Sequence, residues 1–405
     1  MKNHTRTQKP QGNGPNEARD ASGSDHHLFA PDPIRILTAV PICDGHDSAI
    51  NTINLELIRA GVEVVYLGYH RSVRDIVRAA IQEDVRGVGI SSYNGGHVEF
   101  FGDVVRQLKA EGAGQIKVFG GGGGTISRRD AQAMRRRGVD RIFTAGTPLS
   151  EIVNYVRSRF SNRRGSTLRS PKRPAAASQK PNDRWIAQML SVATNQDCCG
   201  GTGSATAAPV IGITGPGGAG KTTLIDELVW RYLRLRDDFR VAILSHDPSI
   251  VAGGALLGDR ATMIDCQHDR VFMRSLATQG QSGGLAPQTS RALELLKRLP
   301  FDVIILETVG TGQEAVPFPP GTVDCSIFAI SPDYGSPLQL QKIAMLDVAD
   351  VVVVNKSDLP GAPRASAELE QRIAANHRGQ QVIATTAKRH NDEGVQRLFE
   401  MLCRL

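Results

Sequence analysis

A glycine-rich segment carries the clearest chemistry in this sequence. Residues 215–222 read G-P-G-G-A-G-K-T and match the pattern G-x-x-x-x-G-K-S/T at every fixed position. Glycines let backbone N–H groups turn toward phosphate oxygens, and a following helix presents its positive end to them. Lys221 is expected to reach the β- and γ-phosphates of a nucleotide, and the Thr222 hydroxyl to bind Mg²⁺. The predicted phosphate contacts are Gly215, Gly217, Gly218, Ala219, Gly220, Lys221, Thr222 and Thr223.

The flanking residues fit the context that a phosphate-binding loop needs. Residues 210–214 read as a buried strand, and residues 223–235 read as a helix with Leu224, Leu228 and Leu235 at helical spacing. A glycine-rich turn that binds nothing is the weaker interpretation, because the motif and its context agree.

A second motif predicts which nucleotide binds. Asn355-Lys356-Ser357-Asp358 has the form N-K-x-D and directly follows the apolar run 351–354. The Asp358 carboxylate can accept hydrogen bonds from the ring N–H and the exocyclic amine of guanine, a donor pair that adenine lacks. The sequence therefore favours GTP over ATP, with Asn355 and Lys356 bracing the base pocket. The predicted contacts beyond the phosphate loop are Gly310, Asn355, Lys356, Asp358, Thr386 and Ala387.

An acidic residue ends a further predicted strand near the nucleotide. Glu307 follows the predicted strand 302–306. The next predicted elements are a strand at 324–330, a helix at 337–346 and the strand 351–354, which precedes the N-K-x-D motif. An acid at this position is expected to face Mg²⁺, and the Gly310 N–H is expected to reach the γ-phosphate. A strand-terminal acid that only meets solvent is the alternative, which the phosphate loop makes the weaker one.

The part of the chain before these motifs alternates strands with helices. Five strands and five helices in alternation predict a doubly wound parallel sheet of flavodoxin type, whose ligands bind at the carboxyl ends of the strands. The expected strands are 34–40, 62–67, 87–91, 116–119 and 141–143, and the expected helices are 48–60, 72–83, 97–110, 128–137 and 148–159. We therefore expect an α/β chain with two doubly wound domains, a flavodoxin-like domain and a P-loop GTPase domain.

The loops after the first, third and fourth predicted strands are distinctive. They contain Asp44-Gly45-His46, then Ser91-Ser92-Tyr93, then five consecutive glycines at 120–124. This set resembles the cobalamin-binding domain of coenzyme B12-dependent mutases and methyltransferases, although Tyr93 replaces a leucine of that family and Ala49 a glycine. The resemblance implies that His46 ligates cobalt, that Asp44 holds the other nitrogen of its ring, and that the remaining residues line a tunnel for the nucleotide tail. The implied contacts are Asp44, His46, Ser91, Tyr93, Gly120, Gly121, Gly122 and Gly146.

Residues 209–405 resemble the small G-protein chaperones of methylmalonyl-CoA mutase. The similarity is carried by G-G-A-L-L-G-D-R at 253–260 and E-T-V-G-T-G-Q at 307–313. It implies that Asp247, Asp259 and Glu307 surround Mg²⁺, and that Lys221, Asp259 and Glu307 act in GTP hydrolysis. The order of the two domains is that of fused isobutyryl-CoA mutases. It implies adenosylcobalamin, GTP and Mg²⁺ as ligands, a mutase subunit as partner, and a homodimer.

Composition and charge argue against several other classes of protein. The net charge is +7, but residues 157–184 alone contain nine basic residues and a single acidic one, so a basic linker accounts for the excess. We therefore expect no nucleic-acid partner. Because the sequence contains no apolar run of membrane-spanning length and no signal-peptide core, we expect a cytoplasmic protein without a membrane partner. The expected divisions are a tail at 1–33, domains at 34–160 and 209–405, and a linker with a short helix at 161–208.

The combined motifs predict a GTPase that gates cofactor loading, or protects adenosylcobalamin, for an acyl-CoA mutase. The chain ends after the G-domain, so we expect a separate chain to supply the mutase barrel, or the chain to be truncated. Two alternatives stay open. One is a cobalamin-binding carrier or sensor with a vestigial G-domain. The other is a metal-insertion GTPase of the nickel type, which the lack of a His- or Cys-rich tract disfavours.

Overall fold

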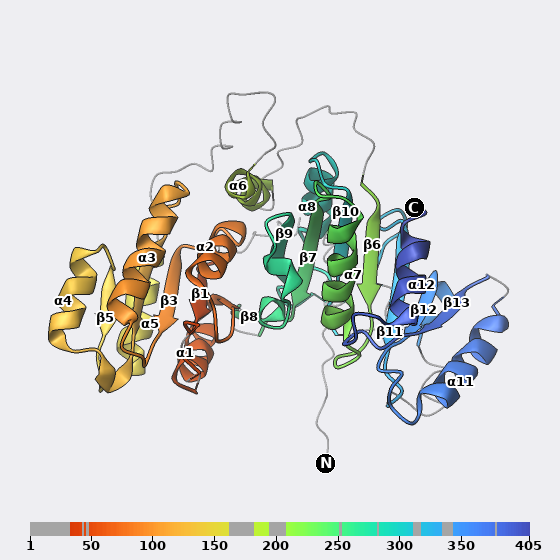
Figure 1. The fold of residues 1–405 in the computed structure, drawn as a ribbon, viewed down its shortest axis with the longest axis horizontal. Helices are drawn as coiled ribbons and strands as arrows, with labels where there is room; N and C mark the ends of the chain where they lie inside the picture. The colour runs from red at the N-terminus through yellow and green to blue at the C-terminus, as the bar shows by residue number, and fades with distance from the viewer. Residues whose placement is uncertain are drawn as a thin grey trace, which may run out of the picture. The chain divides into compact units, whose positions relative to one another are not determined.

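A computed structural model describes most of the chain (Figure 1). The expected tail and most of the linker lie outside the described residues, as do His46, residues 311–316 and most of the helix expected at 337–346. Among the described residues, no helix is long and apolar enough to cross a membrane. The described ranges are 33–42, 44–45, 48–161, 182–193, 208–250, 253–281, 283–310, 317–333, 343–376 and 379–405.

The first sheet has the predicted flavodoxin order. Its strands run in the order β5-β4-β3-β1-β2, and every pair is parallel. The strands are β1 (Arg35–Ala39), β2 (Glu63–Tyr66), β3 (Gly87–Ser91), β4 (Lys117–Gly121) and β5 (Arg141–Phe143). The helices between them are α1 (Ser48–Arg59), α2 (Val73–Gln82), α3 (His97–Ala110), α4 (Arg128–Arg136) and α5 (Leu149–Phe160). The predicted alternation is thus confirmed, with element ends that differ by a few residues.

A sixth strand from the second half of the chain extends this sheet. β8 (Ala255–Leu257) pairs in parallel with β2, so that Val64 lies opposite Leu256. Ala255 and Leu257 are fully buried in the same apolar core as Val65 of β2. A three-residue strand has no periodicity to read, so the sequence did not predict it.

The second sheet contains the phosphate loop and is parallel throughout. Its order is β13-β12-β11-β6-β10-β7-β9, which places β6 between β11 and β10. The strands are β6 (Val210–Thr214), β7 (Val241–Asp247), β9 (Val271–Ala277), β10 (Val303–Glu307), β11 (Cys325–Ile330), β12 (Val351–Val354) and β13 (Gln381–Ala384). The helices of this part are α7 (Lys221–Leu235), α8 (Thr289–Lys297), α10 (Met345–Val348), α11 (Ala362–Ala374) and α12 (Glu393–Leu402). β9, α8 and α11 were not predicted from the sequence.

The short helix expected in the linker is present as α6 (Asp183–Ala193). Its apolar face packs on the second sheet, where Ile186 and Leu190 share a core with Phe272 of β9. Its first residue also contacts the first domain, because the Asp183 carboxylate accepts a 2.6 Å hydrogen bond from Gln82 Nε2. α6 therefore contacts both halves of the described chain (Figure 1).

A glycine in β4 gives a direct test of how β3 and β4 pair in the first sheet. A Cβ atom on Gly120 would lie 2.0 Å from the Ile90 carbonyl oxygen, which β3 cannot move without breaking the sheet. Gly120→Ala should therefore destabilise the fold by about 1–3 kcal/mol and lower the midpoint of thermal unfolding. Gly124→Ala is the matched control, because no atom lies within 4 Å of its added Cβ. Equal midpoints for the two variants would contradict the described pairing of β3 with β4.

Candidate functional site

The phosphate loop connects the end of β6 to the start of α7. Gly220 caps α7 in the left-handed conformation, with φ of +84°, and an added Cβ there would lie 2.4 Å from Asn355 Nδ2. The buried Lys221 ammonium donates hydrogen bonds to the backbone carbonyls of Gly215, at 3.0 Å, and Pro216, at 3.4 Å. Burial lowers the pKa of Lys221, and nearby carboxylates oppose that shift. The loop thus holds a desolvated cation where the motif places nucleotide phosphates.

Three carboxylates, Asp247, Asp259 and Glu307, lie near Lys221 of the phosphate loop. Thr222 Oγ1, the oxygen expected to bind Mg²⁺, donates to Glu307 Oε1 at 3.0 Å. Ser245 Oγ lies within hydrogen-bond distance of both Asp259 and Glu307 Oε2, the latter at 3.1 Å, and can donate its one proton to either. Burial raises the pKa of Asp247, Asp259 and Glu307, and the negative charge of Asp259 adds to the shift of the other two. A bound cation would oppose these shifts by stabilising the ionised carboxylates, so the residues fit a metal ion.

The same acids are not arranged as a complete set of protein ligands. Among the described residues, no group of three or more His, Cys, Asp or Glu side chains is placed to hold a metal ion. Mg²⁺ usually keeps several waters and binds through one or two carboxylates together with substrate phosphates. The Thr222 and Glu307 pair matches that requirement, because the phosphates would supply the remaining ligands.

A buried histidine that the motifs did not identify supports this cluster. His246 lies in β7, with Nδ1 2.7 Å from the Glu307 carbonyl oxygen and Nε2 2.7 Å from Thr289 Oγ1. Burial lowers the pKa of His246 to about 4, so the imidazole is neutral. It can donate from Nδ1 and accept at Nε2, which ties the ends of β7 and β10 to α8. Its only sequence signal is its position beside Asp247 at the end of a strand.

Asn355 connects the N-K-x-D motif to the phosphate loop. Its Nδ2 donates to the Ala219 carbonyl at 3.0 Å, while its Oδ1 accepts from Thr385 Oγ1 and from the Ala387 N–H, both at 3.1 Å. Asp358 pairs with Lys388 at 2.5 Å, and this hydrogen bond lowers the pKa of the carboxyl. Lys356 has a φ of +59°. Asn355 thus joins the phosphate loop, the N-K-x-D motif after β12 and the loop after β13, which are the three segments that should surround guanine.

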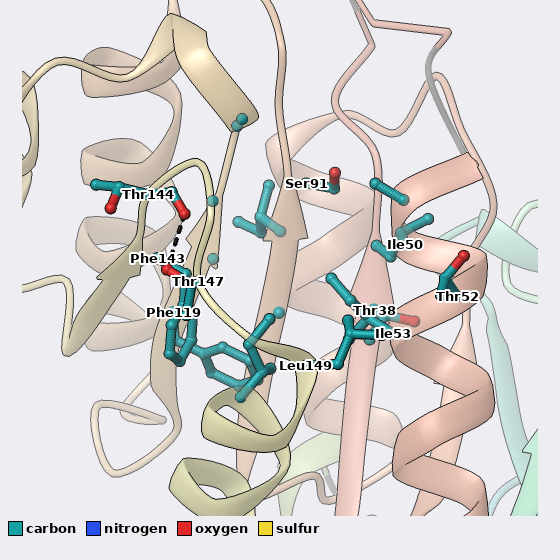
Figure 2. Close-up of a pocket in the computed structure, with 18 of the residues that line it drawn as sticks. Thr38, Ile50, Thr52, Ile53, Ser91, Phe119, Phe143, Thr144, Thr147 and Leu149 are labelled. Carbon is teal, nitrogen blue, oxygen red and sulfur yellow. Dashed lines mark hydrogen bonds between the residues drawn. The ribbon is translucent and has the colours of Figure 1, made fainter.

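The first sheet has a separate cavity of about 340 Å³ at the carboxyl ends of its strands (Figure 2). It brings together six of the eight residues predicted to contact cobalamin, and its described lining contains no charged side chain. Those six are Ser91, Tyr93, Gly120, Gly121, Gly122 and Gly146. Figure 2 shows Ser91 on one side of the cavity and Phe143, Thr144 and Thr147 on another. The lining suits an uncharged aromatic group such as a nucleotide base.

Glycines keep this cavity open by letting two loops approach closely. A Cβ on Gly122 would lie 1.8 Å from the Ser92 carbonyl oxygen. The buried Asp44 carboxylate accepts a hydrogen bond from the Tyr93 backbone N–H, which joins the loop after β1 to the loop after β3. His46 lies outside the described residues, so its predicted role as a cobalt ligand stays a prediction.

Comparison with known families gives one match in each half of the chain. Residues 179–404 match the family described as Methylmalonyl Co-A mutase-associated GTPase MeaB. Residues 34–153 match the family described as the B12 binding domain. The first match covers the phosphate loop, the acid cluster and the N-K-x-D motif, and the second covers the cavity of the first sheet.

Two relatives agree with these matches. A fused isobutyryl-CoA mutase from Cupriavidus metallidurans is 37% identical over 392 residues, which cover 91% of this chain and 35% of the relative. GTPase ArgK of Escherichia coli is 35% identical over 150 residues, which cover 36% of this chain and 44% of ArgK. A solved cobalamin-binding protein from Desulfitobacterium hafniense is 27% identical, covers 31% of this chain and 58% of its own, and has a TM-score of 0.27. The chain spans about a third of the length of the fused isobutyryl-CoA mutases it matches.

The Asp358 carboxylate gives a test of base selection. Asp358→Asn should weaken GTP binding by about 1.5–3 kcal/mol, because one charge-assisted pair of hydrogen bonds to guanine is lost. Binding is measured by titration with a fluorescent GTP analogue. Asp347→Asn is the matched control, since it removes an ion pair of the same 2.5 Å length, with Arg372, outside the motif. ATP that competes with GTP equally well in the unaltered protein would refute the assignment.

Proposed function

The chain belongs to the methylmalonyl-CoA mutase-associated GTPase family, and we propose that it uses GTP hydrolysis to load or protect adenosylcobalamin for an acyl-CoA mutase. The matched families give it a GTPase domain and a cobalamin-binding domain. The observation that carries the proposal is the hydrogen bond of Thr222 to the buried Glu307, with the buried Lys221 under the influence of the same acid, in the same compact unit as the uncharged cavity. The mutase partner, the acyl-CoA class of its substrate and a homodimeric assembly are parts of the proposal.

The proposed GTPase site works by positioning and electrostatics, as phosphoryl-transfer sites generally do. Lys221 would exchange its carbonyl contacts for phosphate oxygens, and Gly310 would donate its N–H to the γ-phosphate. Thr222 and Glu307 would hold Mg²⁺, with Asp247 and Asp259 near it. When bound, the ion neutralises charge on the β- and γ-phosphates.

The proposed cobalamin site uses the loops at the carboxyl edge of the first sheet. His46 would bind cobalt from below, and the cavity between Ser91 and Gly146 would take the displaced nucleotide tail. Asp44 would fix the orientation of the His46 ring, in addition to holding the Tyr93 N–H. When bound, the cofactor supplies radical chemistry that side chains do not provide.

Loss of the phosphate-loop lysine should separate the two activities. Lys221→Ala should lower the kcat for GTP hydrolysis by roughly 10²-fold or more, the loss typical of removing one preorganised charge-stabilising group. Cobalamin binding should be unchanged, because the cavity lies on the other sheet. Phosphate release and the visible spectrum of bound cobalamin measure the two activities. Lys297→Ala, on α8, is the control. GTP hydrolysis that survives in Lys221→Ala would contradict the assignment of this site. A lack of hydrolysis in the unaltered chain would leave the carrier or sensor with a vestigial G-domain as the better account.

The cobalt ligand can be identified by spectroscopy. Bound cob(II)alamin should show an electron paramagnetic resonance signal split by one axial nitrogen of the protein. Labelling the protein with nitrogen-15 should change that splitting from a triplet to a doublet, because the imidazole would be the ligand. His46→Ala should abolish the effect, whereas His268→Ala, in the G-domain, should preserve it. An unchanged triplet in labelled protein would show that the base of the cofactor stays on cobalt.

A further inference from the structure

The segment that carries Asp259 belongs structurally to the cobalamin-binding domain. β8 is the edge strand of the first sheet (Figure 1), and the chain passes from Leu257 through Gly258 into a short turn of 3₁₀ helix at Asp259–Ala261. A Cβ on Gly254, just before β8, would lie 2.0 Å from the Ile58 carbonyl at the end of α1. The residues that lead into the Asp259 turn, from Gly254 to Leu257, thus pack against the first domain.

Arg260 anchors this turn in a buried charge cluster. The side chain is fully buried, its Nε donates to Glu83 Oε1 at 2.7 Å, and its Nη2 donates to Gln82 Oε1 at 2.9 Å. Glu83 also accepts from Arg35 Nη1 at 3.1 Å and from the Ser275 N–H at 3.1 Å. Buried ion pairs add little net stability but fix geometry, so the cluster determines where Asp259 can lie.

Arg71 joins the same turn to the loop that carries the expected cobalt ligand. Its Nη2 donates to the Ala261 carbonyl at 2.7 Å, and its Nε donates to the Leu67 carbonyl at 2.6 Å. Its backbone N–H donates to the Val40 carbonyl at 3.1 Å, and a β-bridge pairs it with Pro41. Pro41 lies only a few residues before Asp44 and His46. Arg71 therefore connects the loop after β1, through its backbone, to the turn that contains Asp259, through its side chain.

The opposite side of this turn faces the nucleotide site. The Gly258 N–H donates to Asp247 Oδ2 at 3.2 Å, and the Asp259 carboxylate accepts from Ser245 Oγ. Ser245 Oγ also lies 3.1 Å from Glu307 Oε2, and Glu307 is the acid that is hydrogen-bonded to Thr222. The turn thus has contacts to both sites, and a shift imposed by one site must change contacts at the other.

We propose that Arg71 and Glu83 are positioning residues for the turn Asp259–Ala261, and that through this turn they make cobalamin occupancy and nucleotide binding depend on each other. This inference rests on the proposed function, since it assumes that the chain binds both ligands. Coupling between two sites is reciprocal, so cobalamin must change nucleotide affinity by the same factor as nucleotide changes cobalamin affinity.

The test measures, in the full chain, the factor by which cobalamin changes the affinity for nucleotide. The affinity for a non-hydrolysable GTP analogue is measured with and without saturating hydroxocobalamin. In the unaltered protein the two affinities should differ by roughly fivefold or more. In Arg71→Met the factor should fall below about twofold, while in Arg71→Lys, which keeps one donor to the Ala261 carbonyl, part of it should survive. Arg86→Met is the matched control, because Arg86 is a half-buried arginine that donates to a carbonyl of its own domain, that of Phe160.

A second measurement does not depend on the folding of any variant. Hydrogen exchange of the unaltered protein should show that adding hydroxocobalamin changes protection of residues 255–261. α12, at the far edge of the second sheet, serves as the internal reference and should be unaffected.

The outcomes separate this inference from the proposed function. If the unaltered chain binds both ligands but shows no coupling and no change at 255–261, the inference is wrong and the proposed function stands. Coupling that persists in folded Arg71→Met, or that is lost equally in Arg86→Met, also overturns it. If the unaltered chain binds only one of the two ligands, the proposed function itself has failed.

Discussion

One buried carboxylate, Glu83, organises the charges at which the two sheets meet. It accepts hydrogen bonds from Arg260, Arg35 and Ser275 and is shielded from solvent. Burial by itself would raise the pKa of Glu83, but Arg260, Arg35 and Arg274 together lower it, so the group stays ionised. Removing one member of such a set leaves a buried charge without compensation, which costs about 3–5 kcal/mol. The cluster therefore specifies which segments meet at this junction.

The charge cluster around Glu83 affects both ligand sites. In a parallel sheet the loops that bind ligands lie at the carboxyl ends of the strands. β8 runs parallel to β2, so its own carboxyl end, with Asp259, lies at the same edge as the loops of the cobalamin cavity. Asp259 is also hydrogen-bonded to Ser245 of β7 in the second sheet. A single turn is thereby shared by the ligand-binding edges of two sheets.

The two sites suit different chemistry because their linings differ. The cavity of the first sheet is formed by glycines, small polar groups and apolar side chains, and its described lining contains no charge. The nucleotide site concentrates the buried Lys221 and Glu307 with the half-buried Asp247 and Asp259. An uncharged base can enter the first without desolvating an ion, whereas phosphates and a cation compensate the charges of the second. Each lining would therefore disfavour the ligand of the other site.

The sequence by itself determined the local elements and most of the residues at both sites. The alternation of apolar runs with helical patterns predicted a parallel sheet of flavodoxin type, and the motifs located Lys221, Glu307 and Asn355, because strand and helix periods and glycine-rich turns are local properties. Only the tertiary structure decided that β8 joins the first sheet and that Arg260 pairs with Glu83, which lies 177 residues away. A three-residue strand and a pair of opposite charges have no local pattern. Their partners are selected by burial, which exists only when the two halves have packed.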